Sequence, residues 1–270
     1  MRKGMVRDAP DLKILQCAEC GLVTLETIDH ISSRFYENSG MHGAKPRSID
    51  AWLKESQWDD LRRFDMVKPS LVNQRLLDFG CGAAGFLLQA SHLAAEVVGI
   101  ELEDRVRQHW EGQLRIVAST DAAGADFDLI TAFHVLEHLS DPREMLSNLS
   151  TLLKRGGRMI VEVPSAEDAL LSLYDCSAFQ QFTYWSQHLF LFNARTLETV
   201  AQQAGLRVVA IQHYQRYPLS NHLHWLSQSA PGGHQRWGFL DTPELTSAYA
   251  NTLAAIGKTD TLIAHLVLDA

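Results

Sequence analysis

Hydrophobic and polar positions follow two different patterns along this chain. The first 70 or so residues have mixed polarity and weak periodicity, and from about residue 75 short apolar runs alternate with amphipathic segments. In the first part, large apolar side chains recur at helical spacing over residues 48–67, which predicts a helix there. A knuckle-like hairpin is predicted at 16–24. We therefore divide the chain into an N-terminal accessory segment, 1–70, and a main domain, 71–270.

The main domain is predicted to alternate strands and helices. Ser140, Asp141 and Pro142 give a helix start, and Gly156 and Gly157 are expected to stop that helix at Lys154. An insertion at 213–242 interrupts the pattern. The predicted strands are 76–79, 96–100, 114–118, 127–133, 159–163, 206–211 and 262–268, and the other predicted helices are 85–93, 196–204 and 242–256. Such alternation predicts a mostly parallel α/β sheet with helices on both faces.

A glycine-rich turn follows the first of these strands. Gly80-Cys-Gly82-Ala-Ala-Gly85 lies between a strand and a helix, where glycine lets the backbone approach a ligand closely. Glu101 ends the next strand, 21 residues after Gly80, which suits a carboxylate that accepts hydrogen bonds from ribose hydroxyls. Asp78 lies just before the turn. Its carboxylate would repel a pyrophosphate but attract the ammonium group of a methionine moiety.

These residues resemble the class I S-adenosylmethionine-dependent methyltransferases, whose first motif is an acidic residue followed by Gly-x-Gly. Three later stretches extend the resemblance over residues 74–212: Val98 to Glu101, Phe127 to Pro142, and Leu152 to Val161. The resemblance implies a Rossmann-like fold with a seven-stranded sheet whose last strand, 262–268, is antiparallel. It also implies S-adenosyl-L-methionine as cofactor, bound by Asp78, Gly80, Cys81, Gly82, Glu101, Leu102, Asp121 and Phe133.

Two histidines are candidates for chemistry on the methyl acceptor. His134 follows the strand 127–133, at the end of the sheet where α/β proteins bind ligands. His188 lies in Tyr184 to Asn193, a stretch that resembles sugar C-methyltransferases and related small-molecule enzymes. Those sugar enzymes carry a Glu-His pair where this chain has Gln187-His188. Either histidine could accept a proton from a hydroxyl, and a histidine that only closes a buried hydrogen bond is an equally good interpretation of His188.

Net charge, apolar runs and cysteine content limit the partners and the location expected for this protein. The net charge is −8, and Lys and Arg form no stripe, so nucleic acid is not expected as a partner. Without an apolar run of ~20 residues no membrane span is expected, and four cysteines without a disulfide pattern fit the cytoplasm. Cys17 and Cys20 resemble half of a zinc knuckle. His30 and His42 are irregularly spaced for completing it, so no metal is predicted.

The predicted function is methyl transfer from S-adenosylmethionine to a hydroxyl of a small molecule. A sugar or sugar nucleotide is the favoured acceptor. The aromatic and polar insertion, with its Pro231-Gly-Gly233 turn, suits a lid over such a ring or, equally, a contact between two copies in a homodimer. Two alternatives stay open. One is an NAD-dependent oxidoreductase on a Rossmann fold, and the other is a cofactor-binding module without activity.

Overall fold

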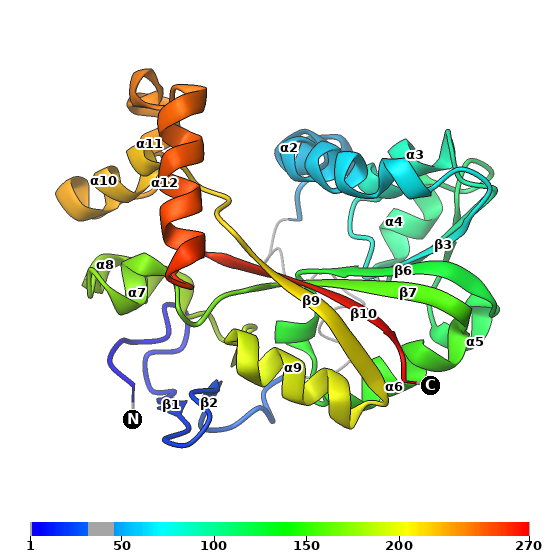
Figure 1. The fold of residues 1–270 in the computed structure, drawn as a ribbon, viewed down its shortest axis with the longest axis horizontal. Helices are drawn as coiled ribbons and strands as arrows, with labels where there is room; N and C mark the ends of the chain where they lie inside the picture. Colours follow the sequence, from blue (N-terminus) through cyan, green and yellow to red (C-terminus); the bar gives the residue numbers. More distant parts are fainter. Residues whose placement is uncertain (1, 32–45, 270) are drawn as a thin grey trace.

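Seven strands form the central sheet of the computed structural model, which describes residues 2–31 and 46–269 (Figure 1). Their order across the sheet is β5 (Arg115–Val117), β4 (Glu96–Ile100), β3 (Arg75–Phe79), β6 (Phe127–Phe133), β7 (Leu153–Pro164), β10 (Thr261–Leu268) and β9 (Leu206–Tyr214). The first five are parallel, and β10 is antiparallel to both of its neighbours. The predicted α/β fold with a mostly parallel seven-stranded sheet and an antiparallel last strand is confirmed.

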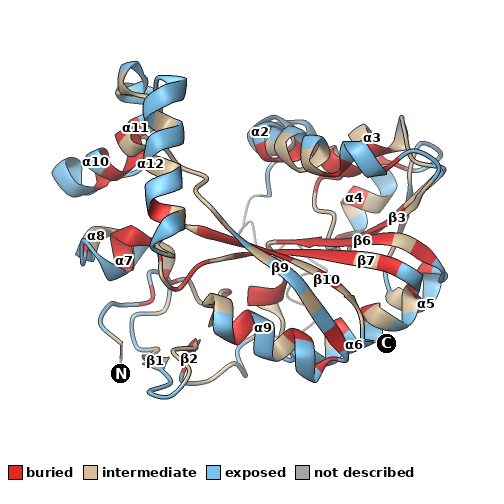
Figure 2. Ribbon diagram, in the orientation of Figure 1, coloured by how far each residue is buried: buried red, intermediate tan, exposed pale blue. Residues whose placement is uncertain are grey.

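Helices cover both faces of this sheet, as predicted. One layer contains α2 (Ile49–Val67), α3 (Gly85–Ser91) and α4 (Asp104–His109), and the other contains α6 (Pro142–Leu152) and α9 (Ala194–Gln203) (Figure 1). Each layer has its own hydrophobic core, because successive side chains of a strand point to opposite faces. Leu76, for example, packs in the core beneath α3, and Leu77 packs in the core beside α6. The central strands are accordingly buried along most of their length (Figure 2).

The end of α6 corrects one prediction. The start is as expected, because Asp141 accepts a hydrogen bond from the Glu144 amide at 2.8 Å and Pro142 opens the helix. The helix ends at Leu152, however, and residues 153–157 already belong to β7, so Gly156 and Gly157 do not stop it. The pairing of β6 with β7 shifts register there, and a Cβ on Gly157 would lie 2.9 Å from the Phe127 carbonyl oxygen. These glycines allow a bulge in a strand, a role that a helix stop resembles in sequence.

The accessory segment is attached to the main domain in two ways. Its hairpin of β1 (Ile14–Gln16) and β2 (Val23–Leu25) adds β8 (Phe190–Leu191) to form a second, three-stranded sheet. Its helix α2 packs on α3 and belongs to the helical layer of the main sheet. Cys17 and Cys20 lie at the hairpin turn. The Nε2 atom of His30 is hydrogen-bonded to the Ser186 carbonyl oxygen at 2.7 Å, and His42 lies outside the described residues.

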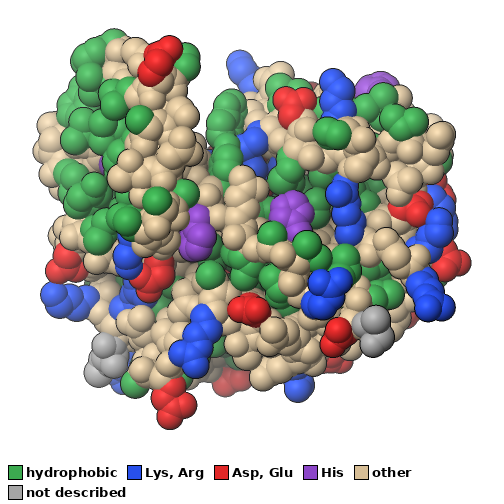
Figure 3. All heavy atoms as spheres, viewed as in Figure 1, with side chains coloured by type: hydrophobic (Ala, Val, Ile, Leu, Met, Phe, Trp, Pro, Cys, Tyr) green, Lys and Arg blue, Asp and Glu red, His purple; other side chains and the backbone are tan. Residues whose placement is uncertain are grey.

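A group of short helices stands beyond the carboxyl ends of β6 and β7 (Figure 1). The predicted insertion folds into α10 (Leu219–Gln228), α11 (Gly233–Arg236) and a short 3-10 helix, η4 (Gly238–Leu240), and it is followed by α12 (Pro243–Ala255). Two further helices, α7 (Ala169–Ser172) and α8 (Ser177–Thr183), lie below them. Figure 3 shows the notch that separates this group from α2 on the surface. The remaining short elements are a 3-10 helix η2 (Lys68–Ser70), α5 (Thr120–Ala123) and a 3-10 helix η3 (Leu136–His138).

Candidate active site

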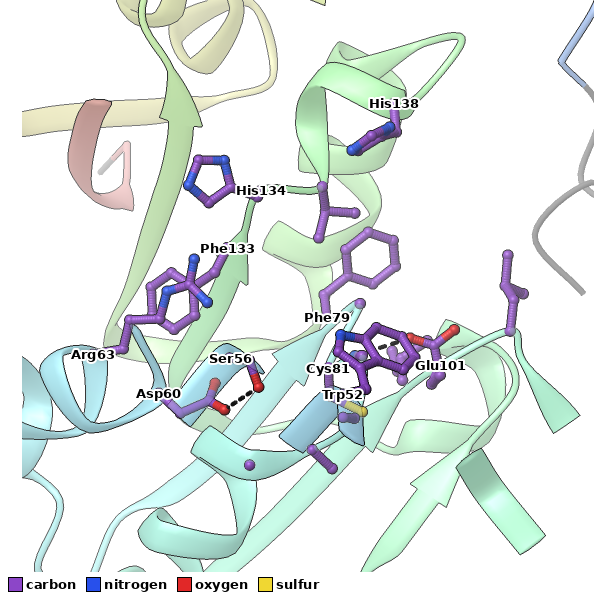
Figure 4. A pocket seen from close by; sticks show the side chains of 18 of the residues that line it. Trp52, Ser56, Asp60, Arg63, Phe79, Cys81, Glu101, Phe133, His134 and His138 are labelled. Atoms are coloured by element: carbon purple, nitrogen blue, oxygen red, sulfur yellow. Dashed lines mark hydrogen bonds between the residues drawn. The ribbon is translucent and has the colours of Figure 1, made fainter. Parts of the chain in front are cut away.

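The glycine-rich turn forms one wall of a cavity of about 290 Å³ at the carboxyl ends of β3, β4 and β6 (Figure 4). We call it the glycine-loop cavity. It is lined by Trp52, Ser56, Asp60, Arg63, residues 79–85, Ile100, Glu101, Leu102, residues 133–135, His138 and Leu139. Of the eight residues predicted to bind the cofactor, it therefore brings together Gly80, Cys81, Gly82, Glu101, Leu102 and Phe133.

Glycine is required at the turn for conformation and for space. Gly80 has φ +70° and Gly82 has φ +53°, in the left-handed region that other residues rarely adopt. A Cβ on Gly80 would lie 2.5 Å from Cγ2 of Val135, and one on Gly82 would lie 3.1 Å from the Trp52 ring. The turn is therefore held closely against η3 on one side and α2 on the other.

Glu101 is held in a fixed orientation at the wall of the cavity. Its two carboxylate oxygens accept hydrogen bonds from the Gly82 amide at 2.9 Å and from the Glu103 amide at 3.0 Å. Burial raises the pKa of this carboxyl despite those two donors. A carboxylate that is clamped by two backbone amides and borders the cavity is well placed to accept hydrogen bonds from a pair of ligand hydroxyls.

Two predicted cofactor residues lie outside the lining, and a third is chemically inert. Asp78 is buried beneath the turn, where its Oδ1 accepts a hydrogen bond from Thr131 Oγ1 at 2.7 Å and burial raises its pKa to about 7. Asp121 lies exposed on α5. Cys81 does border the cavity, and burial raises the pKa of its thiol, so the thiol stays protonated and is no nucleophile.

The sequence analysis missed the contribution of α2. Ser56, Asp60 and Arg63 lie on one face of this helix and border the cavity, and Ser56 Oγ donates a hydrogen bond to Asp60 Oδ2 at 2.6 Å (Figure 4). Their spacing of four and three residues was a usable signal, because it places polar side chains on one side of an otherwise amphipathic helix. The sequence analysis did not use this signal because it assigned residues 1–70 to an accessory segment.

A second cavity, of about 510 Å³, opens beside the first. We call it the histidine cavity. Its walls come from Arg7, η3, the start of α7, α8, the stretch 183–188, residues 216–234 and Asp260, segments that lie far apart in the sequence. His134 and His138 line both cavities. Both histidines predicted to act on the acceptor, His134 and His188, line the histidine cavity, and His134 alone of the two reaches the glycine-loop cavity as well.

His134 lies between two buried carboxylates at the end of β6. Its Nδ1 is 3.1 Å from Glu137 Oε1, and its Nε2 is 3.2 Å from Glu162 Oε1 but is not aligned for a hydrogen bond. Burial lowers the pKa of His134, but the two carboxylates outweigh it and the net pKa is raised. The residue has φ +55°, a strained conformation for a side chain this large, and such strain is concentrated at functional sites.

His188 is in a different environment. Burial, with the nearby His138, lowers its pKa to about 3, so the ring is neutral at ordinary pH. Burial would raise the pKa of Glu137, which is 1% exposed, but the hydrogen bond from His134, together with the electrostatic influence of the surrounding histidines, lowers it below its usual range. Glu137, His138 and His188 each bring one ligand atom to within 4.8 Å of the others.

The far side of the histidine cavity combines acids with aromatic rings. Asp168 is buried there and Asp260 is half-buried, and burial together with the repulsion from Asp260 raises the pKa of Asp168 well above its usual range. Burial also raises the pKa of Asp260, whose carboxylate accepts hydrogen bonds from the Arg216 and Tyr217 amides. The aromatic side chains of the wall are Phe179, Phe182, Trp185, Tyr217 and Trp225.

With this geometry, the chain can be compared with known proteins. Residues 28–211 match the methyltransferase domain family, and the chain belongs to this family. It is thus an α/β enzyme domain of the S-adenosylmethionine-dependent methyltransferase class, as the sequence motifs predicted, and the oxidoreductase alternative has no support.

Individual relatives are distant. The chain is 24% identical over 160 residues to a ubiquinone biosynthesis O-methyltransferase of Aeromonas salmonicida, which covers 53% of this chain and 62% of that protein. It is 27% identical over 168 residues to a tRNA U34 carboxymethyltransferase of Campylobacter hominis, which covers 57% of this chain and 58% of that protein. The chain thus spans less than two thirds of the length of these relatives.

Solved structures show the same fold. A S-adenosylmethionine-dependent methyltransferase of Archaeoglobus fulgidus matches with a TM-score of 0.54 at 18% identity, over 80% of this chain and 98% of that one. A magnesium protoporphyrin IX methyltransferase of Synechocystis with bound S-adenosylhomocysteine matches with a TM-score of 0.54 at 12% identity, over 89% and 99%. Among the described residues, no helix combines the length and the apolarity that crossing a membrane requires.

Proposed function

We propose that this protein transfers the methyl group of S-adenosylmethionine, bound in the glycine-loop cavity, to a hydroxyl of a small molecule bound in the histidine cavity. One observation carries the proposal: His134 and His138 line both cavities. Methyl transfer is an in-line displacement, so the donor and the acceptor must meet across one narrow boundary. The cofactor supplies an electrophilic methyl group.

The residues of the glycine-loop cavity fit this cofactor. Glu101 would accept hydrogen bonds from its ribose hydroxyls, Leu102 would contact the adenine, and the backbone from Gly80 to Gly82 would lie against the methionine part. Phe133 would lie beneath the sulfonium. Asp78 would act on the ammonium group from below the turn, and Asp121 on the adenine amino group from the rim.

The acceptor is proposed to be a hydroxylated ring. Aromatic faces such as those of Trp185 and Trp225 pack against rings, and Asp168, Asp260 and the histidines can bind hydroxyls. The names of several relatives specify O-methyl transfer, which supports an oxygen acceptor. A sugar or sugar nucleotide is the class that we favour. A tRNA acceptor is disfavoured by the net charge of −8 and by the dispersed Lys and Arg side chains on the face drawn in Figure 3.

His134 is the residue that we place against the reacting oxygen, because it borders both cavities and Glu137 holds its ring. His188 lies deeper in the histidine cavity and is placed against the acceptor from the other side. Residues 216–234 form part of the cavity wall, and the region 213–242 would act as a lid.

Calorimetry and methyl-transfer assays test the proposal. We expect the protein to bind S-adenosylmethionine but not NAD, and to transfer a labelled methyl group to sugars, sugar nucleotides or phenols. Binding without transfer to any of a broad set of acceptors would favour the inactive module. Label that accumulates in tRNA and in no small molecule would overturn the proposed acceptor class.

A further inference from the structure

We propose that Glu137, His138 and His188 bind a divalent transition-metal ion of the zinc class in the histidine cavity. The assignment of the site depends on the geometry of these three side chains alone. Only the role that we give to the ion rests on the proposed function. The proposal departs from the sequence analysis, which predicts no metal.

The three residues come from two segments that are fastened together. Glu137 and His138 lie on η3, directly after the end of β6, and His188 lies in the loop before β8. The Leu189 amide donates to the Glu137 carbonyl at 2.7 Å, and His138 Nδ1 donates to the Gln187 carbonyl at 2.9 Å. These bonds hold the candidate ligands close: one donor atom from each residue lies within 4.8 Å of the other two.

The ligand atoms are arranged as in a metal site. Because Nδ1 of His138 is used by the Gln187 carbonyl, its Nε2 points toward Glu137, 4.0 Å from Oε1. His134 Nδ1 in turn contacts Glu137 Oε1 at 3.1 Å. Metal-binding histidines almost always donate their other ring nitrogen to a carbonyl or carboxylate, and ligating carboxylates are themselves hydrogen-bonded. His138 has the first feature and Glu137 has the second.

Two buried polar atoms at this site have no hydrogen-bond partner among the described residues. They are Glu137 Oε2 and His188 Nδ1. A buried carboxylate oxygen without a donor is unfavourable, and a native structure usually explains it by a water, an ion or a ligand. Two such atoms, on two residues of one cluster, indicate a shared partner that carries positive charge.

The donor set selects the kind of ion. Two imidazole nitrogens and one carboxylate oxygen suit zinc and neighbouring divalent ions better than magnesium or calcium, which prefer oxygen ligands alone. Three protein ligands leave at least one coordination position, as in catalytic zinc sites. All three residues border the histidine cavity, so that position is open to the acceptor.

In the proposed reaction, the ion would bind the acceptor oxygen. A bound cation makes a hydroxyl more acidic, so the oxygen loses its proton to solvent in the cavity more readily. The oxygen then forms the new bond to the methyl carbon as the carbon–sulfur bond breaks. The products are a methyl ether, S-adenosylhomocysteine and one proton. His188 is on this proposal a ligand, which accounts for its place in the cavity without making it a base.

Metal binding is best measured by calorimetric titration with Zn²⁺ and by the visible absorption of bound Co²⁺. The full chain carries Cys17→Ser and Cys20→Ser in these experiments, because the exposed thiol of Cys17 and the half-buried thiol of Cys20, on one turn, would bind both ions themselves. We expect one ion per chain. His188→Asn and Glu137→Gln should each weaken binding by more than about 100-fold, beyond the ~10–100-fold loss typical of an outer partner. His92→Asn, which changes an exposed histidine far from the site, is the matched control.

Each result decides between the hypotheses. If the thiol-free protein binds no Zn²⁺ or Co²⁺, or if His188→Asn binds as tightly as His92→Asn, the metal site is wrong whatever the activity. If Glu137→Gln fails to fold, the His188→Asn comparison still stands. Stoichiometric metal binding in a protein that transfers no methyl group would keep the site and refute the proposed function. S-adenosylmethionine binding with activity unchanged by metal removal would keep that function and refute the role of the ion.

Discussion

The two cavities that meet at His134 are built in different ways. The glycine-loop cavity takes most of its wall from three neighbouring strand ends and the turns that follow them, so its chemistry is written in short, contiguous motifs. The histidine cavity is assembled from segments between Arg7 and Asp260 that meet only in the folded chain. Apart from the side chains of α2, the first cavity is built from neighbouring strand ends and the turns after them, whereas the second is built from segments that lie far apart in the sequence.

From this difference we infer that the choice of methyl acceptor depends on the histidine cavity. The glycine-loop cavity, the proposed cofactor site, tolerates little change, because its geometry depends on positive φ angles and on close packing. A cavity walled by loops and short helices can change its side chains without disturbing the sheet. We therefore expect substitutions in the histidine cavity to act on turnover, and substitutions in the glycine-loop cavity to act on cofactor affinity and stability.

The largest effect is expected for His188→Asn. The variant should lower kcat by about 10²–10⁴-fold, the range found when an acid–base or metal-bound group that acts on the reacting oxygen is lost. Its affinity for S-adenosylmethionine should equal that of the wild type, because His188 does not border the glycine-loop cavity. Single-turnover kinetics and calorimetry on the folded variant measure both quantities, with His92→Asn as control. If the rate and the cofactor affinity fell together, the inference that the two cavities have separate roles in turnover and in cofactor binding would be wrong.

The same difference explains what the sequence could and could not predict. The strands 96–100 and 127–133 and the position of Glu101 follow from apolar runs and a local motif, and the structure has both strands with those bounds. The proximity of Glu137, His138 and His188 does not follow from the sequence, because 50 residues separate His138 from His188. Tertiary contacts, among them the hydrogen bonds of Leu189 to Glu137 and of His138 to Gln187, bring them together. The motif predicts Asp78 as a cofactor residue, but its hydrogen bond from Thr131, which lies on another strand, does not follow from the motif.

Asp78 allows a test by pH on the glycine-loop side. Burial raises its pKa from 3.8 to about 7 in the folded protein. Below about pH 7, the Asp78 side chain is therefore mainly the neutral acid in the folded protein. Below pH 4 both states are protonated and the wild type should match Asp78→Asn in stability. As the pH rises to 7 and above, the unfolded chain ionises first, and the wild type should lose up to about 4 kcal/mol relative to the variant.

Denaturant unfolding of both proteins between pH 4 and pH 8 measures this difference. Asp65→Asn, at an exposed position of α2, controls for the general effect of removing a negative charge. A stability difference that stays constant with pH would show that folding does not change the pKa of Asp78.

A smaller effect is expected for Glu101→Ala. The substitution removes the charged acceptor proposed for the ribose hydroxyls, which should cost ~1.5–3 kcal/mol of binding energy. That corresponds to a loss of about one to two decades in affinity for S-adenosylmethionine. The Kd for the cofactor, measured by calorimetry, should rise while zinc binding stays unchanged. Glu111→Ala, at an exposed position, is the control, and an affinity equal to that control would refute the assignment.

The smallest effect is expected for alanine substitutions that distinguish two reasons for glycine at position 80: its positive φ angle and the close packing around it. Gly80 and Gly112 have similar φ angles, +70° and +76°, so alanine at either position should cost the same ~1–2 kcal/mol of backbone strain. The surroundings differ. A Cβ on Gly112 would meet nothing within 4 Å among the described residues, whereas one on Gly80 would lie 2.5 Å from a methyl group of Val135.

Gly80→Ala should therefore be less stable than Gly112→Ala by a further ~1–3 kcal/mol, the usual cost of overpacking. The free energy of unfolding of both variants, measured in denaturant, gives the difference directly. Val135 lies between the turn and η3, so relief of the clash would move the backbone that carries Glu137 and His138. Gly80→Ala should thus also weaken metal binding, and Gly112→Ala should not. Equal stability of the two variants would mean that the turn needs glycine only for its φ angle, and that the two cavities are less tightly joined than the packing at Val135 indicates.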